Sequence, residues 1–257
     1  MFSIIIKELR VYAKSKRIRN IQLLYVSVLS LLLFLLSVEL SLRGQASMSA
    51  KNAPGNEMFS VLIISAFLLL LALATPVLAN YSILKEDETL SLLGHAQIII
   101  GKLSALSIIT IVMPLSILPL LSLSAYTGGL PLSKIVLCYV IIFIASVAFN
   151  SMGMLWATIC KREELTITTS YATICTLTFM PFILPVFSNA FGINIQIPTK
   201  IAQAFSPLYA MFATLGYVSD VTVVNLSIWW ITLILYVLVS VVLTLLLLRE
   251  LWIFRPR

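Results

Sequence analysis

The stretch IQLLYVSVLSLLLFLLSVELSL, from Ile21 to Leu42, decides the fold class of this chain. It contains one charged residue, Glu39, and as a helix it is long enough to cross the roughly 30 Å hydrocarbon core of a bilayer. A helix is the expected conformation for such a run, because unpaired backbone polar groups find no partner in lipid. The stretch therefore predicts a membrane-spanning helix.

Five further apolar runs make this chain an all-α integral membrane protein with six transmembrane helices. The expected spans are Ile21–Leu42, Met58–Ile83, Leu103–Tyr126, Ile135–Ile159, Leu165–Phe187 and Leu226–Leu248. The chain of 257 residues is 60% hydrophobic and 11% charged, whereas a soluble domain carries roughly 25% charged residues. We expect a single transmembrane domain over residues 1–257, with no room for an appended soluble domain.

The basic residues are distributed unevenly between the two sides of the membrane. Of the 17 lysines and arginines, thirteen lie in the N-terminal segment, in the loops after the second and fourth spans and in the C-terminal segment, and four lie on the other side. This bias predicts a multi-pass protein of the inner (plasma) membrane with both termini in the cytoplasm. It also accounts for the net charge of +7 without a nucleic-acid partner.

The three cysteines form no CxxC pair and are expected to be small packing residues rather than metal ligands.

Residues 1–20 have the pattern of an amphipathic helix lying in the cytoplasmic interface, an elbow before the first span. One face carries Ser3, Lys7, Arg10, Lys14 and Arg17. The residues broadly opposite it are Phe2, Ile5, Ile6, Leu9 and Ala13. The alternative is a basic tail that only fixes topology.

The region 188–225 between the fifth and sixth spans is predicted to hold two short helices. PTKIAQAF (Pro198–Phe205) and SPLYAMFATLGY (Ser206–Tyr217) are each too short to cross a bilayer. Ser206 is a good N-cap, Pro207 suits a first helical turn, and Gly216 can end a helix. We expect both helices to be re-entrant, dipping into the outer half of the membrane.

The loop of residues 84–102 carries four consecutive charged residues, Lys85 to Glu88. Burying them in lipid would cost on the order of 10 kcal/mol, so the loop is expected in the cytoplasm. Thr89 and Leu90–Leu93 then form a short helix with an acidic start and a leucine face, which Gly94 can end. This pattern is typical of a docking surface, and the alternative is a solvated loop that joins two helices.

The segment EDETLSLLGHAQIIIGK, from Glu86 to Lys102, resembles the first cytoplasmic loop of ABC-2 type permeases, the membrane subunits of ABC exporters. The KELR start at Lys7–Arg10, the six spans and the short helices before the last span are similar to the same family. The resemblance covers the layout of essentially the whole chain.

The resemblance implies a transport subunit that forms a homodimer and docks onto a dimeric cytoplasmic ABC ATPase through a coupling helix. ATP and Mg²⁺ would be bound by that ATPase, this chain would bind no cofactor, and an accessory subunit is a further expected partner. The residues that match the coupling region are Glu86, Asp87, Glu88, Thr89, Leu90 and Leu93. A second charged cluster on the same side could make a lesser contact or only end helices; it consists of Lys161, Arg162, Glu163 and Glu164.

The chain is not expected to be an enzyme. A phosphate-binding loop needs GxxxxGK followed by Ser or Thr, whereas Leu103 follows Lys102 and Ala96 stands in place of the first Gly. An intramembrane hydrolase is disfavoured because the only histidine, His95, falls in the loop 84–102.

The stronger alternative to an ABC permease is an ATP-independent secondary transporter or channel. Such proteins usually place ionisable residues in mid-membrane, and these spans offer only uncharged polar residues there.

Overall fold

The computed structural model describes residues 2–43, 54–73, 95–119, 121–122, 131–160, 162–191, 196–217, 222–223 and 226–253. The helices are α1 (Phe2–Lys14), α2 (Lys16–Arg43), α3 (Pro54–Leu73), α5 (His95–Ser116), α7 (Leu132–Cys160), α8 (Glu163–Phe191), α9 (Gln196–Phe205), α10 (Pro207–Leu215) and α11 (Ile228–Ile253). Two-residue strands, β1 (Thr222–Val223) and β2 (Leu226–Ser227), pair antiparallel just before α11.

Five of these helices, α2, α5, α7, α8 and α11, are long and apolar enough to cross a membrane. They confirm the prediction of an all-α protein with several membrane spans. The apolar part of α3, Glu57–Leu71, is shorter, and the second half of the expected span Met58–Ile83 lies outside the described residues. The count of six spans therefore stays a prediction.

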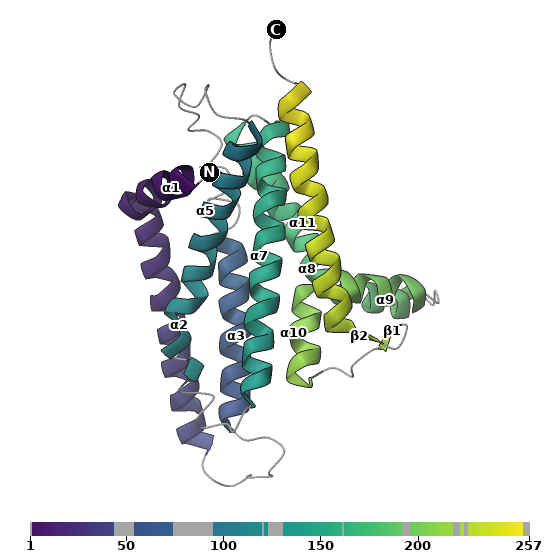
Figure 1. Cartoon of the computed structure of the whole chain (residues 1–257). Coiled ribbons are helices and arrows are strands. Elements are labelled where there is room, and N and C mark those ends of the chain that lie inside the picture. The colour runs from purple at the N-terminus through teal and green to yellow at the C-terminus, as the bar shows by residue number, and fades with distance from the viewer. Residues whose placement is uncertain are drawn as a thin grey trace.

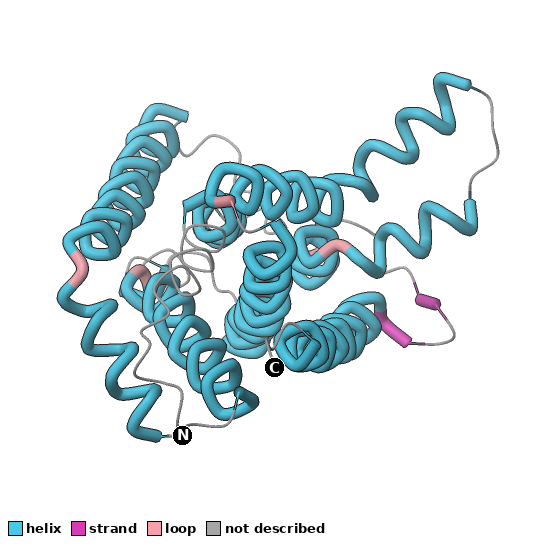
Figure 2. Tube along the Cα trace, turned by 90° about the horizontal axis from the view of Figure 1, so that it is seen from above, coloured by secondary structure: helices cyan, strands magenta, loops and turns pink. Residues whose placement is uncertain are grey.

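The long helices run side by side, and the shorter helices α1 and α9 lie across them (Figure 1). α1 makes a wide angle with α2 at the upper end of the bundle, and the C-terminal end of α11 lies toward that same end. α9 runs across the lower half. Seen from above, the C-terminal part of α8 and the neighbouring α9 project together from the bundle (Figure 2).

The core of the bundle forms around α7, which packs against α5, α8, α10 and α11. Small buried residues on α7, Ala145, Ala148 and Gly153, allow neighbouring helices to approach closely. Beside them the Phe149 ring meets the Tyr236 ring of α11 edge to face, with centroids 5.6 Å apart. Because lipid is as apolar as these side chains, such packing rather than exclusion of water holds the helices together.

The elbow helix is shorter than the pattern over residues 1–20 predicts. α1 ends at Lys14, and the Ser15 N–H donates to the Tyr12 carbonyl over 3.1 Å. The Ser15 carbonyl then accepts from the Arg19 N–H, 3.2 Å away, at the start of α2. Residues 16–20 are thus the first turn of the spanning helix, whose long basic side chains can reach the membrane surface from there.

The two short helices before α11 form where the sequence predicts them. Ser206 caps α10, since its Oγ accepts from the Tyr209 N–H over 3.2 Å, and Pro207 occupies the first turn. Gly216 ends the helix with φ of 89°, in the left-handed region that favours glycine.

The joint between α9 and α10 is fixed to two spanning helices. The Ser206 hydroxyl donates to the Thr178 carbonyl of α8 over 2.7 Å, close to Pro181, which interrupts the backbone hydrogen bonds of α8. The Tyr236 hydroxyl of α11 donates to the Phe205 carbonyl over 2.8 Å. The break in the chain is therefore held inside the bundle.

Candidate functional site

The six residues predicted to form the coupling region lie outside the described residues: Glu86, Asp87, Glu88, Thr89, Leu90 and Leu93. The structure does describe the helix that follows them. α5 begins at His95, earlier than the expected span, because the apolar run after the loop continues the helix. Its first turns lie at the same end of the bundle as α1 (Figure 1), against which α5 packs.

The second charged cluster lies at the corner between α7 and α8. Lys161 and the side chain of Glu163 are outside the described residues, whereas Arg162 and Glu164 are exposed. The Arg162 carbonyl accepts from the Thr166 N–H over 3.0 Å and from the Thr166 hydroxyl over 2.9 Å. These bonds fix the first turn of α8, where acidic side chains also favour the positive end of the helix dipole.

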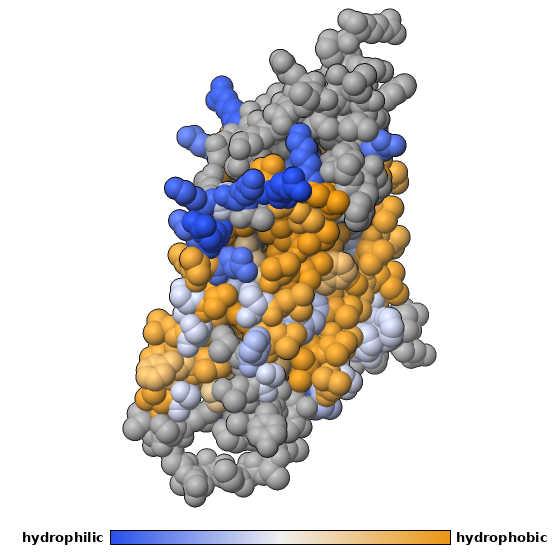
Figure 3. All heavy atoms as spheres, turned by 60° about the vertical axis from the view of Figure 1, so that its left-hand side comes forward, coloured by the Kyte–Doolittle hydropathy of each residue, from blue (hydrophilic) through white to orange (hydrophobic). Residues whose placement is uncertain are grey.

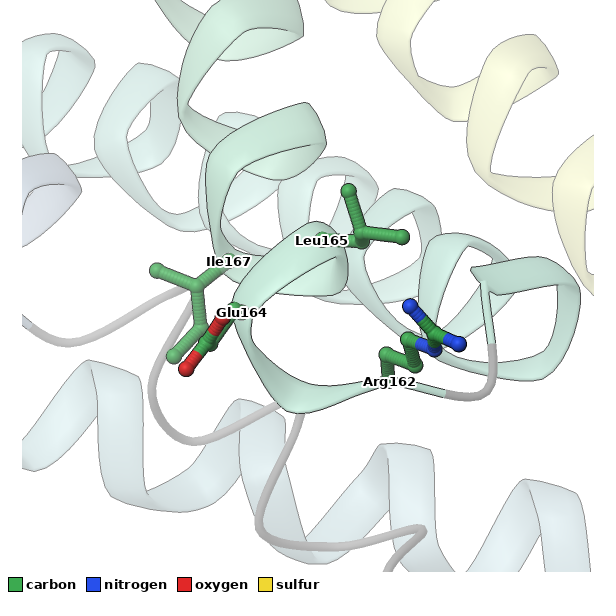
Figure 4. Close-up of a pocket in the computed structure, with 4 residues that line it drawn as sticks. All are labelled: Arg162, Glu164, Leu165 and Ile167. Atoms are coloured by element: carbon green, nitrogen blue, oxygen red, sulfur yellow. The ribbon is translucent and has the colours of Figure 1, made fainter.

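A hollow of about 680 Å³ opens beside this first turn. Arg162, Glu164, Leu165 and Ile167 line it (Figure 4). Arg162 and Glu164 extend to opposite sides of the turn, and both side chains are exposed. Among the described residues, no group of three or more His, Cys, Asp or Glu could hold a metal ion.

Lys7, Arg10 and Lys14, which were predicted to share one face of the elbow helix, are exposed on α1. Arg17, predicted to continue that face, belongs instead to α2 because the helix breaks at Ser15, and its side chain lies outside the described residues. The sequence pattern did not identify Tyr12, which is only 1% exposed and belongs to the buried core. Tyr12 lies one helical turn after Leu9 and Glu8, and this spacing is the signal that could have revealed the packed face.

A polar contact joins α5 and α7 deep in the bundle. The fully buried Asn150 donates through Nδ2 to Thr110 Oγ1 over 3.1 Å, so Asn150 has a packing role between the two helices. One turn further along α5, Pro114 accepts at its carbonyl from the Tyr139 hydroxyl over 3.2 Å. A cavity of about 20 Å³ between them is lined in part by Thr110, Tyr139 and Ser146. It has room for about one water molecule.

No family model and no curated protein matches the sequence. The similarity to ABC-2 type permeases therefore rests on the coupling-loop motif and on the layout of the helices.

Proposed function

We propose that this chain is the membrane-spanning permease subunit of an ABC transporter, an exporter that couples transport to ATP hydrolysis by a separate ATPase. The observation that carries the proposal is the position of two helix starts. The start of α5 and the α7–α8 corner lie at one end of the bundle, together with α1 and the C-terminal end of α11 (Figure 1). In the sequence, the predicted coupling residues come shortly before the start of α5, so we infer that a single partner on that side contacts both charged segments.

The charges and aromatic residues support a cytoplasmic placement of this end. Lys14, Lys16, Arg19, Arg162 and Arg249 are exposed side chains of the helix ends there, as the positive-inside rule expects. At the opposite end of α11, Trp229 and Trp230 stack with ring centroids 4.5 Å apart, in keeping with the aromatic belt of a membrane interface. The helix between Trp230 and Arg249 is about 28 Å long at 1.5 Å per residue, close to the thickness of the hydrocarbon core.

In the proposed mechanism, closure of the ATPase dimer upon ATP binding pushes on residues 86–93. α5 continues directly from that loop and packs against α1 and α7, so it can carry the displacement into the bundle. Two copies of the chain would switch from inward-facing to outward-facing states, since nucleotide binds one state more tightly. Spans without mid-membrane charges suit a lipid-like or amphipathic cargo. In this mechanism, α9 and α10 dip into the outer half of the membrane, beside the place where the cargo leaves the dimer.

Purification of the tagged full chain in a mild detergent tests this proposal. We expect a stoichiometric ATPase with its own phosphate-binding loop, and we expect its hydrolysis rate to change when the permease is present. A chain that purifies without an ATPase and transports cargo without nucleotide would contradict the proposal and favour an ATP-independent transporter or channel.

The orientation is testable by cysteine labelling in a variant without Cys138, Cys160 and Cys175. A cysteine at Asn56, just before the apolar part of α3, is expected to react with a membrane-impermeant maleimide added to whole cells. A cysteine at His95 is expected to react only after the cells are opened. The reverse pattern would place both termini outside the cytoplasm.

A further inference from the structure

A band of basic side chains crosses the outer surface where α1 meets α2. Arg10 and Lys14 of α1 and Lys16 and Arg19 of α2 are all exposed. In Figure 3 a hydrophilic band faces the viewer, with a largely apolar surface beside and below it that contains scattered, weakly polar side chains. We call these four residues the elbow band.

The part of the elbow band on α1 points away from the protein because the opposite face of α1 packs against the bundle. At 100° per residue, Lys7, Arg10 and Lys14 span about 60° of the helix circumference, and Tyr12 lies about 170° from their centre. Tyr12 is buried in the core, and α1 packs chiefly against α5. The basic side chains therefore extend sideways from the bundle, at the level where lipid headgroups surround a membrane protein.

The surface below the elbow band is apolar and open to lipid. On α2, Leu23, Leu31 and Phe34 are each at least 60% exposed. A ligand that fits both the elbow band and the apolar surface of α2 has a negatively charged group beside the band and hydrocarbon chains along α2. Phospholipids with a net negative charge have this structure.

We propose that the elbow band binds the phosphate groups of anionic phospholipids. The guanidinium groups of Arg10 and Arg19 can each hold two phosphate oxygens in a planar fork, and the ammonium groups of Lys14 and Lys16 add point charges. Basic clusters on amphipathic helices next to a span bind anionic lipids because each charge lies near the negative membrane surface. α1 is thereby held between a lipid outside and α5 inside.

A second copy of this chain is a less suitable occupant of the same surface. A symmetric dimer contact places the same patch of both copies face to face. Four positive charges would then meet four identical ones, which is unfavourable. The elbow band is therefore expected to stay on the lipid-facing side of any dimer.

Lipid titration of the detergent-solubilised full chain tests the proposal, with bound lipids counted by native mass spectrometry. Phosphatidylglycerol is the probe, and phosphatidylcholine with the same acyl chains is the neutral comparison. We expect tighter binding of phosphatidylglycerol, with a loss of about fivefold in affinity for each charge removed. The variant Arg10→Gln/Lys14→Gln/Arg19→Gln should therefore lose about a hundredfold.

Two matched variants serve as controls. Arg10→Lys/Lys14→Arg/Arg19→Lys keeps the charges and should keep most of the preference. Lys134→Gln removes a charge at the start of α7, at the other end of the bundle, and should leave it unchanged. Equal affinity of the unmodified chain for both lipids, or unchanged binding by the glutamine variant, would overturn the proposal.

The salt dependence of the unmodified chain gives an answer even if the glutamine variant does not fold. Raising ammonium acetate from about 0.1 M to about 1 M shortens the screening length from about 10 Å to about 3 Å. Phosphatidylglycerol binding should weaken strongly, while phosphatidylcholine binding should not. Salt-independent binding of phosphatidylglycerol would also overturn the proposal. Neither measurement involves the ATPase, so this proposal and the transport function can fail separately.

Discussion

If the proposed function is right, reversal of the acidic run, Glu86→Lys/Asp87→Lys/Glu88→Lys, is expected to detach the proposed ATPase partner from this chain. A docking surface with complementary charges becomes one with like charges, and such juxtaposition costs several kcal/mol. The resulting loss of association should be at least about a hundredfold, since each 1.4 kcal/mol is a factor of ten. The added lysines lie on the side where positive charge is already expected, so the orientation of the chain should not change.

Co-purification and nucleotide-dependent transport in vesicles measure this effect. The matched control is Glu164→Lys at the α7–α8 corner, where the side chain is exposed and a lesser contact is expected. This variant should lose less than the triple variant, and both should keep the helix content of the unmodified chain by circular dichroism. If the triple variant retains its ATPase and its transport rate, the coupling role of residues 86–88 is wrong.

Truncation of the central aromatic residue, Phe149→Ala, is expected to have the largest effect on stability. Phe149 is 1% exposed and packs against Tyr236 at the contact between α7 and α11. Removing a buried aromatic ring leaves a cavity and typically costs about 3–5 kcal/mol. The loss should be felt even in lipid, because the lost contacts are those between helices and not those with water.

Phe34→Ala provides the comparison, since Phe34 is 61% exposed on α2. Lipid can replace the contacts of an exposed ring, so this variant should be destabilised much less. Unfolding in mixed micelles of increasing dodecyl sulfate content, followed by circular dichroism, measures both variants. Equal destabilisation of the two would show that Phe149 does not hold α7 and α11 together.

The parts of the fold that depend on neighbouring residues could be predicted from the sequence. α10 is the best example, because Ser206, Pro207 and Gly216 set its two ends through their own backbone chemistry. The spanning helices were also predictable, because long apolar runs have no alternative to a helix in lipid.

Features that depend on distant parts of the chain could not be predicted in the same way. The break at Ser15 separates α1 from α2, and Tyr12 becomes buried because α1 packs on α5, about 90 residues later in the chain. The bond between Asn150 and Thr110 likewise joins two helices whose relative rotation no local pattern specifies. For the coupling residues the sequence gives the expected side of the membrane and the charge, but a docking geometry depends on the partner.

The central position of α7 has a consequence for the order in which this protein is made. α11 is synthesised after every other helix that the structure describes, yet its Tyr236 supplies the ring that packs on Phe149 and the hydroxyl that holds the Phe205 carbonyl. Until it arrives, the joint between α9 and α10 lacks one of its two attachments, and α7 lacks a main neighbour. A nascent chain halted before Ile228 would thus lack the contacts that close the bundle around α7.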